Sequence, residues 1–481
     1  MLRFEPPTLK EELNEAIRLW VDQLQLKPSV CFYEFDAVLE VLLQGADPSN
    51  YDDQIITFDT EIDLSLPKWD DSLILPVKDF FALTDELKNT KLIENQICRS
   101  NKRTLVYIEE VNDVAIRTLY HAIPDAENAA EEKIRTKLIE LKKRLFFLDE
   151  ALRSEKIDAP DLYRLKAEYN KKDKDANDLA KKLEKPTKRF FTQEISSNGV
   201  NILCSITQGF TIFGVMLASE KEYSKYSPPV GDYYLLEIRS EEKITEILER
   251  NIIEAYFFEL SSSLNIEFKI SSRIEDDGDW LYHGLDEYDF SPRFRPLLIG
   301  KGIVDLLELF NRAIASTDYD VQILYFTKVV EYVSQTVIKM HSNEAIRAKL
   351  LSPRALQPDA SYIAELKKIV EAENNLARDK EAIKLTVATC CEVSELAKIA
   401  PPFLKKLKSL SENSNKKEAL EKLSLSLYST RNEVAHAKAN YNPTGDECPK
   451  DQLASFAVCA KLVAQQVIRW YHLTPETIRL P

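Results

Sequence analysis

Three residues near the C-terminus have types and spacing suited to the cleavage of RNA. They are Arg431, Asn432 and His436, in the segment STRNEVAHAK (429–438). Asn432 and His436 are four residues apart, so a helix places them on one face. Histidine has a suitable pKa to accept the proton of a 2′-hydroxyl, and the fork of arginine donors suits a phosphate on which charge is building. The sequence predicts a catalytic centre made of these three residues, with no metal ion and no cofactor.

Arg431 falls where an apolar helical stripe should continue. Leu420, Leu423 and Leu427 precede it at three- and four-residue spacing. A guanidinium in that position needs either a carboxylate partner or an opening onto a polar groove. Glu331, inside an upstream apolar helix, is a possible partner. The alternative is a salt-bridged arginine and a helix-terminal histidine in an inert bundle.

The common signatures of other enzyme classes are absent from the sequence. It contains no G-x-x-x-x-G-K-[ST], no H-E-x-x-H and no G-x-S-x-G, and its 10 glycines are too sparse for phosphate-binding loops. Nucleotide hydrolysis and zinc-dependent hydrolysis are therefore disfavoured. Four carboxylates at 275–279 lack the spacing of a calcium loop and indicate a solvated loop.

The pattern R-N-x-x-x-H, late in a helical region and followed by a loop and one last long helix, resembles the HEPN superfamily. The helix predicted at 324–337 (LYFTKVVEYVSQTV) also resembles the aromatic-rich helix in the first half of HEPN domains. The resemblance covers residues of about 303–475 only. It implies that Arg431 contacts the scissile phosphate, that His436 acts as acid and base, and that Asn432 supports both. It also implies an active site at the groove of a symmetric homodimer.

Residues 301–481 show helical periodicity almost throughout. An apolar stripe runs from Phe326 to Met340, and another from Leu453 to Trp470 follows Pro449, a favourable first helical residue. Four or five helices with such stripes predict an all-α bundle.

Residues 123–188 form a second helical region of a different kind. Apolar residues alternate at spacings of four and three from Ile134 to Leu152, and the pattern resumes from Leu162 to Leu183 after a break near Pro160. Two apolar seams joined by a short turn predict an antiparallel coiled-coil hairpin. Such a hairpin is either an arm that binds a protein partner or a helical pair folded back on its own domain.

The remaining regions, residues 1–122 and 189–300, predict α/β domains that are possibly continuous with each other. Residues 51–66 and 104–109 have strand-like content, and NGVNILCSITQGFTIFGVML (198–217) suggests a β-hairpin with Gly209 near its turn. A strand–helix–strand unit follows. The expected fold class is α+β and multidomain: an α/β platform interrupted by the coiled-coil hairpin, then the helical bundle.

Charge is distributed unevenly along the chain. The net charge is −15, but residues 301–481 carry 25 Lys and Arg against 22 Asp and Glu, and residues 1–300 carry 39 against 57. The C-terminal third is thus the part that can approach a polyanion. The 7 cysteines form no C-x-x-C pair, and no segment has the layout of a secretory signal or a membrane span. These features predict a cytoplasmic protein without membrane association.

Taken together, the sequence predicts a metal-independent endoribonuclease that acts on RNA as an antiviral defence or toxin effector, with residues 1–300 in a regulatory role. The alternative is a non-catalytic HEPN protein that dimerises or binds, with the coiled-coil arm engaging a partner.

Overall fold

A computed structural model describes most of the chain. The described residues are 3–24, 30–32, 55–65, 72–94, 96–112, 125, 129–153, 159–181, 187–197, 199–220, 234–271, 294–376, 378–409, 415–435 and 444–480. The chain divides into two compact units. The first consists of 1–110, 116–246 and 270–292, and the second of 111–115, 247–269 and 293–481.

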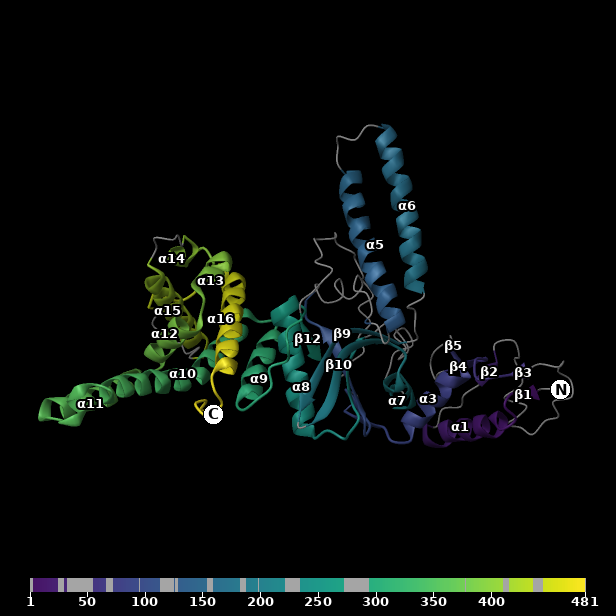
Figure 1. The fold of residues 1–481 in the computed structure, drawn as a ribbon, viewed down its shortest axis with the longest axis horizontal. Helices are drawn as coiled ribbons and strands as arrows, with labels where there is room; N and C mark the ends of the chain where they lie inside the picture. Colours follow the sequence, from purple (N-terminus) through teal and green to yellow (C-terminus); the bar gives the residue numbers. More distant parts are fainter. Residues whose placement is uncertain are drawn as a thin grey trace. The chain divides into compact units, whose positions relative to one another are not determined.

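An antiparallel sheet forms the centre of the first unit (Figure 1). Six of its seven strands follow the order β6-β7-β8-β11-β10-β9. They are β6 (Lys91–Ile93), β7 (Ile97–Arg99), β8 (Arg103–Glu110), β9 (Thr187–Ser197), β10 (Val200–Gly209) and β11 (Tyr234–Ser240). β8 and β11 each contain a run of four or more consecutive buried residues, as expected for strands that are covered on both faces.

The sequence-based prediction of a hairpin within residues 198–217 is wrong. Residues 200–209 form the single strand β10, and the following residues form a helix, α7 (Ile212–Glu220). The hairpin lies one strand earlier, with β9 pairing antiparallel to β10. Its turn contains Gly199, whose φ of 82° favours glycine. α7 is apolar on every side because it is buried, and a buried helix has no amphipathic pattern to distinguish it from a strand.

Helices cover one face of this sheet. α1 (Leu9–Leu24), α3 (Val77–Leu87) and α7 share an apolar core with sheet residues such as Leu105 and Leu235. Trp20 of α1 packs against Phe80 of α3, and its indole N–H donates to Thr84 Oγ1 at 2.8 Å. Smaller sheets complete the N-terminal part: β1 (Arg3–Phe4) with β3 (Ile55–Ile56), and β2 (Val30–Phe32) with β4 (Glu61–Ser65) and β5 (Ser72–Pro76).

Two long helices, α5 (Ala129–Arg153) and α6 (Ala159–Lys181), lie side by side in the first unit (Figure 1). Leu138 and Leu141, early in α5, pack with Ala176, late in α6, so the helices run in opposite directions. An ion pair between Arg144 and Glu168 at 3.0 Å joins their middles. The predicted helical region at 123–188 is therefore an antiparallel helix pair.

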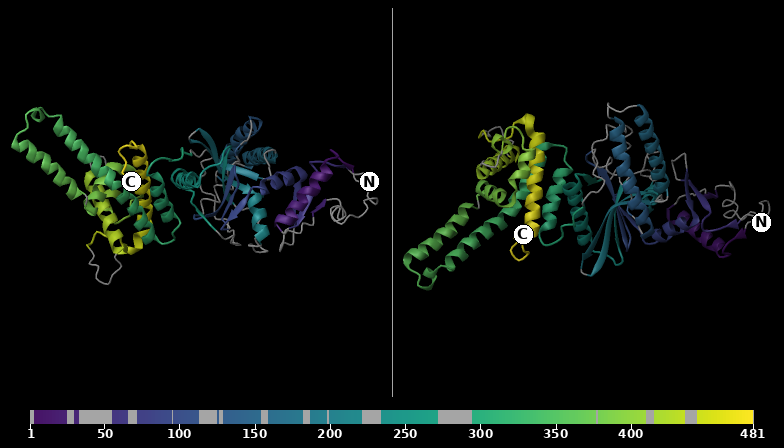
Figure 2. Two further views of the ribbon diagram at one scale, coloured as in Figure 1. Left: turned by 90° about the horizontal axis from the view of Figure 1, so that it is seen from below. Right: turned by 45° about the horizontal axis from the view of Figure 1, so that its top comes forward.

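In the second unit, the regular elements of the described residues are helices apart from one short strand. Its elements are α8 (Glu246–Glu259), the π-helix η1 (Leu260–Leu264), β12 (Phe268–Ile270), α9 (Ile303–Ile314), α10 (Tyr319–Leu350), η2 (Pro353–Leu356), α11 (Ala360–Leu376), α12 (Asp379–Cys390), α13 (Val393–Ile399), α14 (Lys405–Lys408), α15 (Lys416–Ala435), η3 (Lys450–Gln452) and α16 (Leu453–Leu473). α10 contacts α9, α12, α15 and α16, so it is the central helix of the bundle. Its C-terminal half pairs with α11 and extends beyond the other helices of this unit (Figure 2).

The boundaries of the compact units differ from the predicted domain ranges. The prediction assigned all of 189–300 to the α/β part, whereas α8 belongs to the helical unit. Ala255 and Phe258 of α8 lie in the same apolar core as the bundle, and Asn311 of α9 donates to the backbone oxygen of Glu254 at 3.0 Å. The coarse fold class is confirmed: the protein is mixed α and β, with an antiparallel sheet and a helical C-terminal region. Among the described helices, none combines the length and apolar character needed to cross a bilayer.

Candidate active site

α15 carries two of the three predicted site residues near its C-terminal end. Its apolar side chains Leu423 and Leu427 are buried against the bundle, and this stripe continues to Arg431 as the sequence predicted. α15 packs against α10 and α12. Ala435 is its last residue; His436 lies outside the described residues.

The chain that returns after α15 is bonded to the same end of the helix. The Cys448 backbone N–H donates to Thr430 Oγ1 at 2.8 Å, and Thr444 Oγ1 donates to Ser429 Oγ at 3.2 Å. An ion pair joins Asp446 of the same returning segment to Lys422, in the first half of α15. These bonds hold the turn of helix that precedes Arg431 and thereby limit where its side chain can go.

Arg431 lies between two polar partners. Its Nη1 donates to Asn432 Oδ1 at 2.8 Å, and its Nη2 donates to Glu331 Oε2 at 3.3 Å. The same Nη2 is 3.1 Å from Glu331 Oε1, and the two side chains are 20% and 23% exposed. The predicted pairing of Arg431 with Glu331 is therefore confirmed, and Arg431 and Asn432 are brought into direct contact.

The Arg431–Glu331 pair is incompletely hydrogen-bonded. Arg431 Nε and Glu331 Oε1 are both buried, and neither has a hydrogen-bond partner in the described part of the chain. A buried polar atom left without a partner costs about 1–3 kcal/mol. Among the described residues, the Nε–H of Arg431 is thus left without an acceptor, and Glu331 Oε1 contacts Arg431 only as an ion pair, at 3.1 Å.

The environment of Glu331 raises the pKa of its carboxyl group. Burial is the main cause, and Asp379 at the start of α12 adds to it; the positive charge of Arg431 acts in the opposite direction without cancelling it. Asp379 was not among the residues predicted from sequence. The available signal was weak, because an acidic residue in the first turn of a helix is ordinary.

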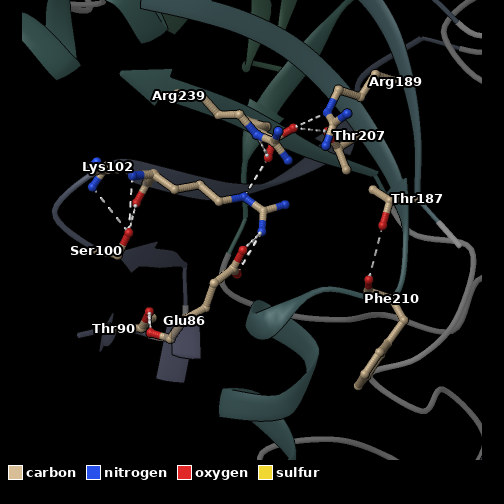
Figure 3. Close-up of polar contacts among 11 residues, drawn as sticks. Glu86, Thr90, Ser100, Lys102, Thr187, Arg189, Thr207, Phe210 and Arg239 are labelled. Atoms are coloured by element: carbon tan, nitrogen blue, oxygen red, sulfur yellow. Dashed lines mark hydrogen bonds and ion pairs between the residues drawn. The ribbon is translucent and has the colours of Figure 1, made fainter. Parts of the chain in front are cut away.

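A second and larger ionic cluster lies on the sheet of the first unit (Figure 3). Glu237 of β11 is 1% exposed and accepts four hydrogen bonds. Its Oε1 accepts from Arg103 Nε at 2.5 Å and from Arg239 Nε at 2.7 Å. Its Oε2 accepts from Arg189 Nε at 2.7 Å and from Thr207 Oγ1 at 3.0 Å. Arg103 also donates from Nη1 to both oxygens of Glu86, at 2.8 and 2.7 Å.

Sequence reasoning missed the Glu237 cluster entirely, because its members come from four strands and one helix. Burial by itself raises the pKa of Glu237, but the three arginines outweigh it and lower the pKa to about 2. Every lone-pair position of this carboxylate is occupied, so the cluster joins strands and has no acceptor left for a ligand. Elsewhere in the described residues, no group of three or more His, Cys, Asp or Glu side chains is arranged to hold a metal ion.

No protein-family model matches the chain, and comparison with the curated proteins and with the solved structures gave no match either. The candidate site is therefore judged on its residues and geometry.

Proposed function

We propose that the second unit is a metal-independent endoribonuclease whose catalytic residues are Arg431, Asn432 and His436. The observation that supports it most is the state of Arg431. Its guanidinium is half-buried at the end of α15, next to Asn432, and its Nε–H has no acceptor within the described residues. This nitrogen is buried, so a phosphate oxygen, the acceptor that suits it, reaches it only after neighbouring side chains have moved.

The proposed reaction is transesterification within the RNA chain. His436 accepts the proton of a ribose 2′-hydroxyl, and the 2′-oxygen forms a bond to the adjacent phosphorus. The bond from phosphorus to the 5′-oxygen of the next nucleotide breaks, and that oxygen takes up a proton. The products are a 2′,3′-cyclic phosphate end and a 5′-hydroxyl end. Arg431 neutralises the growing charge on the phosphate, and Asn432 orients the guanidinium through its side-chain oxygen.

The wider proposal rests on the resemblance to the HEPN superfamily. By that resemblance the protein acts as a homodimer in the cytoplasm, as an antiviral defence or toxin effector. The first unit would then regulate the second. The near balance of charge in residues 301–481 is compatible with RNA reaching the bundle rather than the acidic N-terminal part.

The test is cleavage of single-stranded RNA by the full-length protein in EDTA, with mass spectrometry of the new ends. Arg431→Ala and His436→Ala are each expected to lower the rate by about 10²–10⁴-fold, the range for loss of an acid–base or charge-stabilising group. Arg354→Ala and His341→Ala are matched controls, since both residues are exposed in the same unit. Cleavage that survives both site substitutions contradicts the proposal.

A second candidate function is binding without catalysis through the α5–α6 pair, proposed as a coiled-coil arm for a protein partner. The observation that favours it is Tyr163 on α6, a large side chain that is 78% exposed. In this case removal of residues 127–185 abolishes the biological effect and His436→Ala leaves it intact. The opposite pattern supports the nuclease.

A further inference from the structure

Arg431 is not ready to bind an anion as it stands. Nη2 is bonded to Glu331, Nη1 is bonded to Asn432, and Nε is buried. Each nitrogen is therefore either engaged by a neighbour or covered. A phosphate that uses two N–H groups of this guanidinium therefore competes with Glu331 for Nη2 or with Asn432 for Nη1.

The contact that blocks Arg431 is a weak one of its kind. Glu331 offers two oxygens, but only Oε2 meets hydrogen-bond geometry, and the distance of 3.3 Å is long for a charge-assisted bond. Oε1 has no hydrogen-bond partner in the described residues. The pair thus holds Arg431 through one long hydrogen bond and an ion-pair contact at 3.1 Å, and an anion that supplies its own charge and acceptors can replace the carboxylate.

We propose that Glu331 is an autoinhibitory latch, which occupies Arg431 until a phosphodiester takes the place of its carboxylate. The inference rests on the proposed function, because it concerns the same arginine and names the RNA backbone as the competing ligand. The Glu331 carboxylate repels a phosphate that approaches the same half-buried guanidinium, so it opposes RNA binding, and the phosphate binds Arg431 best when it replaces the carboxylate. Arg431 is held by α15 and Glu331 by α10, so a small shift between these helices opens the latch.

Proton binding provides a second way to open the latch. The charged groups that act on Glu331 are Arg431 on α15, Asp379 on α12 and Lys328 on α10 itself. Burial, the largest influence, raises the pKa of Glu331, so it takes up a proton at a higher pH than an ordinary glutamate. The neutral carboxyl group no longer pairs with Arg431 and leaves the guanidinium available to an anion.

The test separates binding from cleavage. A fluorescein-labelled single-stranded RNA 20-mer with 2′-fluoro riboses cannot undergo the proposed reaction, and its affinity for the full-length protein is measured by fluorescence anisotropy in EDTA. Glu331→Gln is expected to bind about fivefold to tenfold more tightly than the wild type, a change of roughly 1–1.4 kcal/mol. The gain should disappear in the double variant Glu331→Gln/Arg431→Ala, because the latch acts through that arginine.

Glu373→Gln is the matched control. Glu373 on α11 pairs with Lys339 and Ser342 of α10, so this variant removes the same charge from the same helix surroundings without touching Arg431. Its affinity for the RNA should stay within about twofold of the wild type. Because the pKa of Glu331 is raised above 4.5, the wild type should approach Glu331→Gln as the pH is lowered from 7.5 towards 4.5, and the ratio of their affinities should shrink. Other titrating groups are common to both proteins and cancel in that ratio.

The latch is overturned if Glu331→Gln binds no more tightly than the wild type, if Glu373→Gln shows the same gain, or if the gain persists without Arg431. These outcomes differ from failure of the nuclease proposal. A gain in affinity for 2′-fluoro RNA, with no cleavage of ordinary RNA by any variant, supports the latch and contradicts the nuclease. Arg431-dependent cleavage with no gain in affinity supports the nuclease and contradicts the latch.

Discussion

Glu237 in the first unit and Glu331 in the second are both paired with arginine, yet their surroundings differ. Glu237 is 1% exposed, accepts four hydrogen bonds and has its pKa lowered to about 2. Glu331 is 23% exposed, accepts one hydrogen bond and has its pKa raised by burial. An arginine partner therefore does not by itself show whether a buried carboxylate is an anchor or a movable group.

The number of donors decides between the two roles. Burial raises the pKa of both carboxylates, and only enough donors can reverse the effect. Around Glu237, three guanidiniums and a hydroxyl provide them. Around Glu331, one guanidinium provides a single bond, and the charge of Asp379 opposes it. We infer that the saturated cluster serves the fold and the unsaturated pair serves the site.

The largest effect is expected from Glu237→Gln. The glutamine amide places N–H donors against guanidiniums and removes the negative charge that three arginines share, so the first unit should lose about 3–5 kcal/mol of unfolding free energy. Hydrogen–deuterium exchange of peptides from β10 and β11 reports the stability of this unit separately. An unchanged protection of these strands would show that the cluster is not an anchor.

Acid should destabilise the first unit through the same residue. Because the pKa of Glu237 is lowered from 4.5 to about 2 by folding, the unfolded chain binds its proton first. The stabilisation is complete above pH 4.5 and is lost as the pH falls towards 2, by about 3 kcal/mol. The exchange protection of β10 and β11 is measured between pH 4.5 and 2 and corrected for the pH dependence of the intrinsic exchange rates. It should fall more steeply in the wild type than in Glu237→Gln. Equal slopes would remove Glu237 as the cause.

Glu259 extends the comparison to a saturated carboxylate in the second unit. It is fully buried and accepts from both terminal nitrogens of Arg469, at 3.2 and 2.9 Å, and from Ser263 Oγ at 3.0 Å. Glu259→Gln should lower the unfolding free energy by about 2–3 kcal/mol, less than Glu237→Gln because Glu259 binds one guanidinium and Glu237 binds three. Hydrogen–deuterium exchange protection of α16 measures this loss of unfolding free energy. A cost at or above that of Glu237→Gln would break the relation between donor number and stability.

The smallest change in stability is expected from Glu331→Gln. Removing the carboxylate charge relieves its desolvation and loses one long hydrogen bond, so the two effects nearly cancel and the net change should stay within about 1 kcal/mol. Hydrogen–deuterium exchange protection of α15 and thermal unfolding both report this net change in unfolding free energy. A loss as large as that of Glu259→Gln would place Glu331 among the anchors and leave the latch without support.

The helical unit could be predicted from sequence in some detail because its signals are local. The stripe of Leu420, Leu423 and Leu427 gave the buried face of α15, and its continuation to Arg431 indicated a need for a carboxylate. The partner Glu331 was identified a hundred residues away because it, too, interrupts an apolar helix. The hairpin expected at 198–217 failed because α7 is buried on all sides, and such a segment has no period that separates helix from strand.

The sequence by itself determined the buried stripes of α10, α15 and α16, the helix pair α5–α6 and the polar residues at the end of α15, since these follow from spacings of three and four residues. Only the tertiary structure decided that α8 belongs to the helical unit, that β9 pairs with β10, and that three arginines meet at Glu237. Arg103, Arg189 and Arg239 are far apart in the chain, and strand order alone brings them together. Spacing encodes which face a residue occupies, whereas its distant neighbours depend on how whole elements pack.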